Sequence, residues 1–363
     1  MGGTHESNGR PGLQLVPTVS HTGKARGRPL YWSVFHCTAD MKNLTKRAFF
    51  ALACLTCSGA LLAQAYPNRS IRLVVPFPAG GATDILSRTL AQKASEKLGQ
   101  QIVIDNRPGA GGTIGSDFVA KSAADGYTLL MATGSTHAVN PITNPKIPYN
   151  VERDFTPLAL VANTASVLVV PGNLPVKNLA EFIALAKSKP GQLNFGSSGN
   201  GTNSHLSGEL FKAQAGVFIT HIPYRGTGLV FNDMMSGQVQ MLMDNYVTSQ
   251  SNIREGKLRV LGVTSLQRLP FLPDAPTLDE QGLKGFDVTN WFGIYGPKGV
   301  PADVIARVNT AFNQTLQDAD VLKRLQSLGA TPMSGTPDDM AKLVAADTAK
   351  WRKLIRERRL VVD

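Results

Sequence analysis

Cysteine is scarce in this 363-residue chain, with three copies that all lie before residue 58. Residues 66–363 therefore contain no thiol, which excludes a disulfide framework, a cysteine nucleophile and a thiolate metal site from that part of the chain. About 300 residues remain there, enough to bury a core that folds without such cross-links.

Sequence patterns of catalysis are also scarce. After residue 65 histidine occurs three times and never as an HExxH pair, and there is no Walker A lysine. The run Gly109–Gly115 resembles a dinucleotide fingerprint but has Ile114 at the third glycine position, and Gly196-Ser-Ser-Gly lacks the spacing of a nucleophile elbow. We therefore predict no enzymatic activity, no cofactor and no metal site.

No apolar run reaches the roughly 20 residues that a membrane-spanning helix needs. The run at 48–62 follows a basic stretch and precedes Ala63-Gln-Ala65, as in a secretory signal peptide with its cleavage site. We expect translation to begin at Met41, cleavage after Ala65 and a periplasmic location. Residues 1–40 are interpreted as a mis-assigned or disordered extension, and 41–65 as the signal peptide.

The positive charge is less concentrated than the total of +11 suggests. Seven basic and two acidic residues lie within 1–65, so residues 66–363 carry a net +6. Basic and acidic side chains alternate there, as in Arg88, Lys93, Glu96 and Lys97, which is typical of a solvated helix face. Without a basic run interleaved with aromatics, we predict no nucleic-acid partner.

Strand and helix signals alternate along residues 66–363, which favours an α/β fold with helices on the faces of a sheet. The apolar patterns predict strands at 71–75, 101–104, 127–131, 158–170, 193–195, 217–222, 239–243, 257–264 and 286–295. They predict helices at 85–98, 114–123, 179–187, 206–214, 228–236, 302–328 and 337–356.

The simplest layout has two domains joined by two chain crossings, which is the geometry of a hinge. A discontinuous first domain would comprise 66–165 and 290–363, with 166–289 as an inserted second domain.

Glycine- and serine-rich turns follow strands in both predicted domains. Phe77–Asp84 leads into a helix with Thr83 or Asp84 as its N-cap, Gly196–Ser204 leads into a helix that begins near Thr202, and Thr133–His137 follows a third strand. Free N–H groups at a helix N-terminus attract anions. Together these turns predict a cleft that holds a small anion at the carboxyl ends of strands.

These segments also carry a family resemblance. The sequence resembles the Bug family, the extracytoplasmic receptors of tripartite tricarboxylate transporters, in order over nearly all of 66–363. The resemblance rests on Tyr66–Asp84, Asn106–Gly112, Asp125–Leu130, Phe195–Thr202, Ser204–Leu206, Pro223–Gly226, Gly237–Val239, Leu272–Thr277 and Leu328–Ala330.

The resemblance implies a two-domain periplasmic binding-protein fold, type II-like, with the ligand cleft between the domains. Such a receptor closes on a small carboxylate, whether a di- or tricarboxylate, an aromatic acid or an amino acid, and delivers it to integral-membrane transporter subunits. We expect a monomer. The implied ligand contacts are Phe77, Ala79, Gly80, Gly81, Thr83, Asp84, Thr133, Ser135, His137, Ser197, Ser198, Thr202, Ser204 and Asp244.

Several alternatives stay open at this stage. Asp84 would contact a ligand ammonium or hydroxyl, or only cap its helix, and Arg225 could reach an anion that the main loops bind without arginine. Thr227–Val230 departs from the family pattern, which leaves ligand preference at the second-domain wall undecided. A periplasmic ligand-sensing subunit, or a secreted hydrolase on the same scaffold, remains as an alternative function.

Overall fold

The computed structural model describes residues 66–360. The extension expected at 1–40 and the signal peptide expected at 41–65 lie outside these residues. Within the described residues, no helix combines the length and apolar character needed to cross a membrane.

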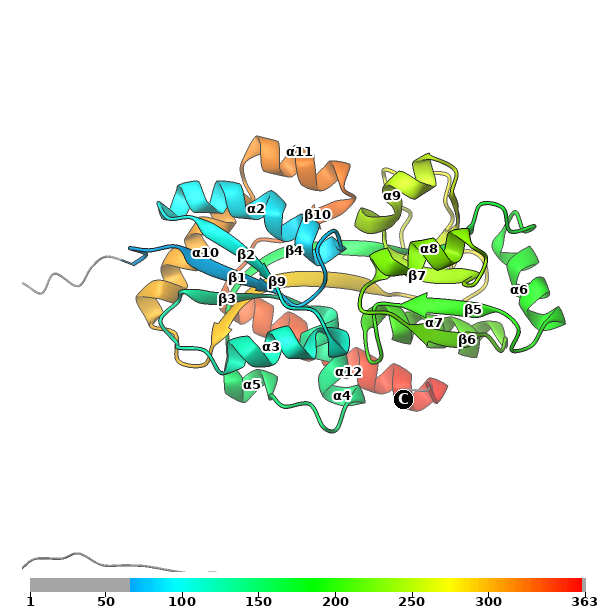
Figure 1. Cartoon of the computed structure of the whole chain (residues 1–363), viewed down its shortest axis with the longest axis horizontal. Helices are drawn as coiled ribbons and strands as arrows, with labels where there is room; N and C mark the ends of the chain where they lie inside the picture. Colours follow the sequence, from blue (N-terminus) through cyan, green and yellow to red (C-terminus); the bar gives the residue numbers. More distant parts are fainter. Residues whose placement is uncertain (1–65, 361–363) are drawn as a thin grey trace, which may run out of the picture. The chain divides into compact units, whose positions relative to one another are not determined.

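Ten strands form one continuous sheet, in the order β2-β1-β3-β9-β4-β7-β5-β6, with β8 and β10 both paired to β4 (Figure 1). The strands β1, β2 and β3 pair in parallel, as do β5, β6 and β7, whereas β4 and β9 are antiparallel to their neighbours. The strand bounds are β1 Ile71–Val75, β2 Ile102–Asn106, β3 Thr128–Thr133, β4 Phe155–Pro171, β5 Asn194–Ser197, β6 Thr220–Pro223, β7 Met241–Asn245, β8 Leu258–Val263, β9 Thr289–Pro297 and β10 Ala330–Pro332.

Helices follow most of the parallel strands, as the alternation of signals predicts. Their bounds are α2 Ala82–Leu98, α3 Thr113–Ala120, α4 Asn140–Thr143, α5 Val151–Asp154, α6 Leu179–Ser188, α7 Asn203–Ala215, α8 Val230–Met235, α9 Tyr246–Arg254, α10 Ala302–Thr315, α11 Ala319–Ser327 and α12 Pro337–Arg358. Short 3-10 turns η1 (Ala110–Gly112) and η3 (Thr227–Leu229) and a π-helical turn η2 (Ser135–Val139) complete the set.

The long strand β4 divides the sheet into two lobes. Its residues 155–165 pair with β9, and from Ser166 onward it pairs with β7 and β8. We call the part with β1, β2, β3, β9 and β10 the first lobe, and the part with β5, β6, β7 and β8 the second lobe. Figure 1 shows β4 and β9 side by side where the chain passes between the lobes.

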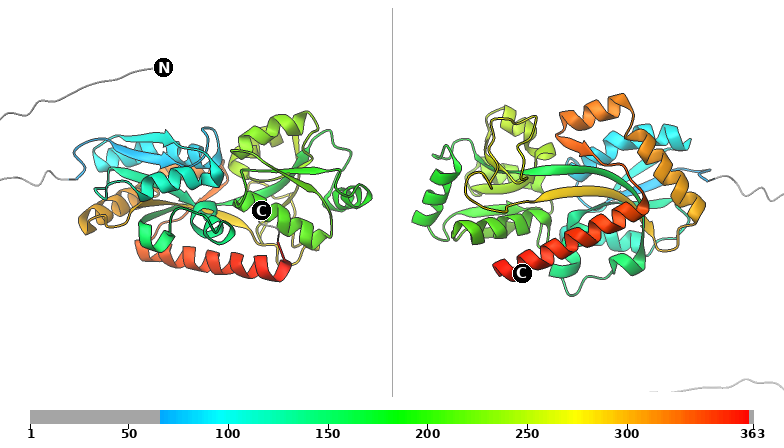
Figure 2. Two further views of the ribbon diagram at one scale, coloured as in Figure 1. Left: turned by 60° about the horizontal axis from the view of Figure 1, so that its bottom comes forward. Right: turned by 180° about the vertical axis from the view of Figure 1, so that it is seen from behind.

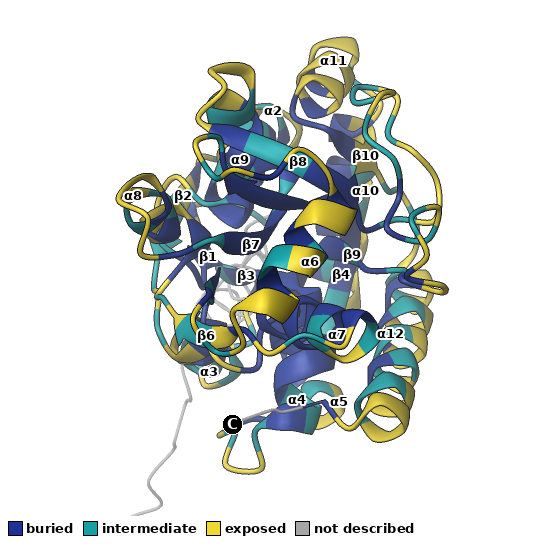
Figure 3. Ribbon diagram, turned by 90° about the vertical axis from the view of Figure 1, so that its right-hand side faces the viewer, coloured by how far each residue is buried: buried dark blue, intermediate teal, exposed yellow. Residues whose placement is uncertain are grey.

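Each lobe buries apolar side chains on both faces of its sheet. In the first lobe, α2, α10 and α11 cover one face through residues such as Leu86, Phe312 and Leu325, and α3 packs on the other. In the second lobe, α6 and α7 bury Phe182 and Phe211. Figure 3 shows these strands as mostly buried between exposed outer helix faces.

The last helix contacts both lobes. Met340 and Val344 of α12 pack in the first lobe, whereas Trp351 joins the apolar cluster of the second lobe. Lys350 Nζ also lies 3.1 Å from Asp287 Oδ2. Figure 2 shows α12 running along the molecule beneath both lobes, so residues after about 350 belong to the packing of the second lobe as well.

The main strands and helices lie where the sequence predicts them, with differences at their ends. The strand expected at 217–222 begins only at Thr220, and the helical stretch 302–328 is two helices separated by a break after Thr315. Helix α9 was not predicted, because its sequence, Tyr246-Val-Thr-Ser-Gln-Ser-Asn-Ile-Arg254, has few apolar residues and no clear helical spacing of them.

Candidate functional site

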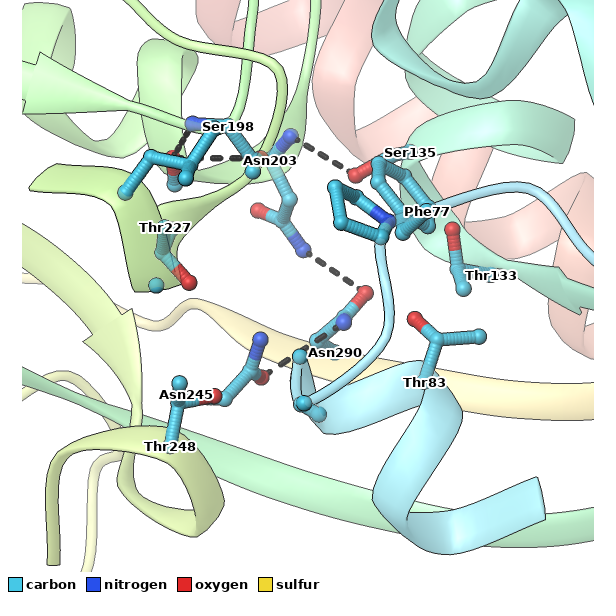
Figure 4. A pocket seen from close by; sticks show the side chains of 18 of the residues that line it. Phe77, Thr83, Thr133, Ser135, Ser198, Asn203, Thr227, Asn245, Thr248 and Asn290 are labelled. Atoms are coloured by element: carbon cyan, nitrogen blue, oxygen red, sulfur yellow. Dashed lines mark hydrogen bonds between the residues drawn. The ribbon is translucent and has the colours of Figure 1, made fainter. Parts of the chain in front are cut away.

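A cavity of about 440 Å³ lies between the two lobes (Figure 4). Three helices begin at its wall, because the first residues of α2 and α7 and the N-cap of α9, Asn245, line it. Helix N-termini present free N–H groups and a partial positive charge. Among the described residues that line the cavity, none is Lys, Arg, Asp or Glu. The wall therefore offers a ligand hydrogen bonds and helix dipoles without a formal countercharge.

The first wall is the loop that joins β1 to α2. Residues 78–81 line the cavity, and Gly80 has a left-handed φ of +79° that favours glycine. Gly81 is the N-cap of α2, in extended conformation and without a side-chain cap. The prediction that Thr83 or Asp84 caps this helix is therefore wrong, because the helix already begins at Ala82.

Asp84 supports this loop from behind. Its carboxylate is buried and accepts hydrogen bonds from Gly80 N at 2.9 Å, Asn106 Nδ2 at 3.0 Å and Arg88 Nε at 3.0 Å. Burial opposes ionisation, but these hydrogen bonds and the Arg88 charge outweigh it and hold the pKa of Asp84 below its usual value. Because Asn106 also donates to the Phe77 carbonyl at 3.1 Å, the network fixes both ends of the loop.

The second wall is the loop that joins β5 to α7. Ser198 and Ser204 line the cavity, and the Ser198 N–H donates to Ser204 Oγ at 3.0 Å. Thr202 is the N-cap of α7, where its side chain accepts from the His205 N–H, and its hydroxyl donates to the Gly199 carbonyl at 2.7 Å. The Thr202 hydroxyl is therefore engaged within the loop.

Two stacked histidines lie beneath this second loop. The ring centroids of His205 and His221 are 3.9 Å apart. His205 Nδ1 accepts from Gly201 N at 3.2 Å, and His221 Nε2 lies 2.6 Å from Ser197 Oγ. Burial, with the nearby His205 and Lys212, lowers the pKa of His221 to about 3, so this ring is neutral at neutral pH.

Three asparagines form the floor of the cavity (Figure 4). Asn203 Nδ2 lies 3.0 Å from the Thr289 carbonyl and 3.4 Å from Asn290 Oδ1. Asn290 Nδ2 in turn lies 3.5 Å from Asn245 Oδ1, which also accepts from Thr164 Oγ1 at 2.7 Å. The Asn203 N–H donates to Ser135 Oγ at 3.0 Å, so Asn203 of the second lobe contacts the first lobe directly.

The structure brings nine of the fourteen predicted site residues to the cavity wall and leaves five outside it. The nine are Phe77, Ala79, Gly80, Gly81, Thr83, Thr133, Ser135, Ser198 and Ser204. The five that do not line the cavity are Asp84, His137, Ser197, Thr202 and Asp244.

The strand geometry explains two of these five positions. Side chains alternate between the two faces of a strand. On β7, Met243 and Asn245 line the cavity, so Asp244 between them faces away from it and accepts from Ser249 Oγ at 2.6 Å. Burial raises the pKa of Asp244 to about 6 against the hydrogen bonds it accepts. Ser197 likewise precedes the lining residue Ser198.

His137 belongs to an aromatic cluster in the first lobe. Its ring centroid lies 4.4 Å from that of Tyr295 and 4.7 Å from that of Phe155, and its Nδ1 lies 3.0 Å from Thr136 Oγ1. Burial lowers the pKa of His137 to about 3, which makes it a neutral core side chain.

Further lining residues were missed by the sequence reasoning. They are Pro78, Ala82, Ser166, Asn203, Gly226, Thr227, Gly228, Leu229, Phe231, Met243, Asn245, Thr248, Asn252 and Asn290. Asn203 lay within a loop already identified, and Asn245 followed the chosen Asp244. By contrast, no local sequence motif marks Asn290, Thr248 or Asn252 as a site residue. They line the cavity only because of how β9 and α9 pack in the folded protein.

The lobes also touch beside the cavity. Gly111 of η1 lies against the second loop, so closely that a Cβ there would lie 2.8 Å from the Asn200 carbonyl oxygen. A second cavity of about 680 Å³ adjoins this contact and is lined by Arg225, which does not line the first cavity. Within residues 66–360, no three His, Cys, Asp or Glu side chains gather as a metal site would require.

Comparisons with known proteins agree on one family. The family model "Tripartite tricarboxylate transporter family receptor" matches residues 86–360. Protein BugT of Bordetella pertussis is 39% identical over 296 residues, which are 81% of this chain and 91% of that protein.

Two solved structures extend the similarity to the fold. One is an R. palustris protein with adipate, 38% identical with a TM-score of 0.79, covering 82% of this chain and 99% of that one. The other is MatC from Rhodopseudomonas palustris with bound malate, 35% identical with a TM-score of 0.77, covering 80% of this chain and all of that one. The predicted α/β, two-domain binding-protein fold is confirmed.

Proposed function

The chain belongs to the receptor family of tripartite tricarboxylate transporters, and from this we propose that it captures a small carboxylate in the periplasm. It delivers that ligand to the integral-membrane subunits of such a transporter. It does so as a monomer, without a cofactor and without catalysing a reaction.

One observation carries this proposal: three helix N-termini meet at a cavity with no charged side chain among its described lining residues. Such a wall favours an anion, because free N–H groups and helix dipoles stabilise negative charge. The cavity volume of about 440 Å³ suits a small molecule. Malate and adipate in the two R. palustris relatives are carboxylates of this size class.

Binding would proceed by closure of the lobes on the ligand. We propose the domain boundaries 66–165, 166–289 and 290–363, which the change of partners along β4 between Ala165 and Ser166 supports. A ligand shifts such an equilibrium only through contacts that are better in the closed state. Ser198 and Ser204 from one lobe and Thr83 and Thr133 from the other are suited to provide them.

The two alternative functions differ in what the receptor does after binding. A ligand-sensing subunit would use the same cavity and present the complex to a signalling partner. For a secreted hydrolase, the Ser197–His221 pair is the strongest candidate, but Ser197 is fully buried and does not line the cavity. We therefore favour binding without turnover.

A thermal-shift screen of the processed protein, residues 66–363, against a library of carboxylates tests the proposal. A ligand that binds only the folded state raises the melting temperature by mass action. We expect a dose-dependent increase with at least one small carboxylate and no consumption of that compound. If no carboxylate raises the melting temperature and none co-purifies, the receptor proposal fails; steady turnover of an ester or amide would establish the hydrolase.

The proposed processing is tested separately by mass spectrometry of protein secreted into the periplasm. We expect a mature N-terminus at Tyr66, and a different terminus would contradict cleavage after Ala65.

A further inference from the structure

In the three asparagines of the cavity floor, the side of each amide that donates is fixed. A backbone carbonyl fixes it at one end of the series. The Thr289 carbonyl can only accept, so the Asn203 side-chain atom that faces it at 3.0 Å is the NH₂ group. Asn290 then accepts from Asn203 and directs its own NH₂ toward Asn245 Oδ1. Each amide in the series determines the orientation of the next.

With the amides oriented in this way, Asn203 Oδ1 and the Asn245 NH₂ group remain for a ligand in the cavity. Asn203 is 5% exposed and lines the cavity, yet its Oδ1 is buried and has no hydrogen-bond partner within the described residues. Figure 4 shows this oxygen on the side of the amide away from Asn290. At the other end, Asn245 Oδ1 is occupied by Thr164 and Asn290, which leaves the Asn245 NH₂ group for the cavity.

The Asn245 NH₂ group and Asn203 Oδ1 require different partner groups on a ligand. The Asn245 NH₂ donates and suits any carboxylate, carbonyl or hydroxyl oxygen, whereas Asn203 Oδ1 can only accept. Among the described lining residues, Thr248 Oγ1 is the other buried side-chain atom without a partner, but a hydroxyl can donate as well as accept and selects nothing. A buried acceptor that stays unpaired weakens binding, so the ligand must bring a donor to Asn203.

We propose that Asn203 is a specificity-determining residue, whose Oδ1 accepts a hydrogen bond from a hydroxyl on the ligand and selects hydroxycarboxylates over the matching unsubstituted acids. An ammonium is the other possible donor, but the positive ends of three helices disfavour a cation, and no acidic side chain is among the described lining residues. This inference rests on the proposed carboxylate-binding function.

Calorimetry with matched pairs of acids tests the proposal, using malate against succinate, 2-hydroxyglutarate against glutarate, and mandelate against phenylacetate. Both enantiomers of each hydroxy acid are measured, and L-aspartate tests the ammonium alternative. For the pair that fits the cavity, we expect the hydroxy acid to bind about tenfold more tightly than its partner. We expect aspartate to bind more weakly than malate.

The variant Asn203→Ala separates recognition from structural support. Loss of the acceptor should reduce the ratio of the two affinities to about one, whereas a merely structural role would weaken both acids equally and leave the ratio intact. Asn252→Ala removes an amide from the same cavity that no hydrogen bond ties to the asparagine series, and it should preserve the ratio. If Asn203→Ala does not fold, the similarly shaped Asn203→Leu provides the same comparison.

The outcomes distinguish the two proposals. If no acid of any kind binds, both fail. If an unsubstituted acid binds as tightly as its hydroxy partner, if the ratio persists in Asn203→Ala, or if aspartate binds best, only the role of Asn203 as a hydroxyl acceptor fails.

Discussion

The two loops that line the cavity look alike in sequence but contribute differently to the fold. Each follows a parallel strand, is rich in glycine and enters a helix. In the first loop, a Cβ at Gly80 would meet nothing within 4 Å, so this position favours glycine for its left-handed φ of +79° and not for a close contact. In the second, a Cβ at Gly201 would lie 2.6 Å from Thr143 Oγ1, so this glycine permits a close contact with another segment of the chain.

The buried polar groups behind the two walls differ as well. Behind the first wall, Asp84 accepts from three donors and has a lowered pKa. Behind the second, burial raises the pKa of Asp244, and His205, stacked on the neutral His221, accepts from Gly201 N of the loop. One loop is therefore held by a charged network and the other by a helix cap and close packing. Breaking each support should therefore have different consequences.

The largest effect is expected at the charged network. Asp84→Ala would remove the acceptor of the Gly80 N–H and one of the two acceptors of the Asn106 amide, which should lower the free energy of unfolding by about 3 kcal/mol. Chemical denaturation at pH 7 measures this loss. Asp84→Asn keeps one acceptor oxygen and should lose less; equal stability of the Ala variant and the native protein would contradict the assigned role.

Substitution of Asp244 should increase the stability of the fold, in contrast to the loss expected at Asp84. Its folded pKa of about 6 lies above the ordinary 3.8, so its favourable contribution is full below about pH 4 and is lost as the pH rises through 6. Asp244→Asn should therefore raise the free energy of unfolding by about 2 kcal/mol at pH 8 and change it little at pH 4. Denaturation curves at pH 4 and pH 8 measure the difference. An equal gain in the free energy of unfolding at both pH values would contradict the raised pKa of Asp244.

The close packing of the second loop can be tested from the other lobe. Gly111 has φ +61°, and Gly111→Ala would place a Cβ 2.8 Å from the Asn200 carbonyl oxygen. Ligand affinity should fall about tenfold, because the contact between the lobes must loosen. Gly216→Ala is the matched control, with φ +62° and nothing within 4 Å. Both variants should lose about 1 kcal/mol of stability to the backbone conformation, but only Gly111→Ala should weaken binding by calorimetry.

The smallest effect is expected at the helix cap. Thr202→Ala removes the N-cap of α7 and should lower the free energy of unfolding by about 1 kcal/mol. Thr202→Ser keeps the hydroxyl and should restore most of that stability. A loss of ligand affinity in Thr202→Ala without any loss of stability would instead indicate direct contact with the ligand.

Much of the fold and part of the site could be predicted because local signals were strong. The apolar spacing of Leu86, Leu90, Ala94 and Leu98 defined α2, and left-handed Gly99 ended it. The loops after β1 and β5 were identified by their glycines and serines. Weakly patterned α9 could not be identified in this way, and it carries Thr248 and Asn252 to the cavity.

The sequence by itself determined the order of the strongly patterned strands and helices, the two glycine-rich loops and the family, because these depend on local periodicity and contiguous motifs. Only the tertiary structure decided which side chains face the cavity. Alternation on β7 turned Asp244 away and Asn245 inward, and packing buried His137 among aromatic rings. The orientation of the amides in the asparagine floor could not be predicted from the sequence either. Asn203, Asn245 and Asn290 lie far apart in the chain and meet only where the two lobes meet.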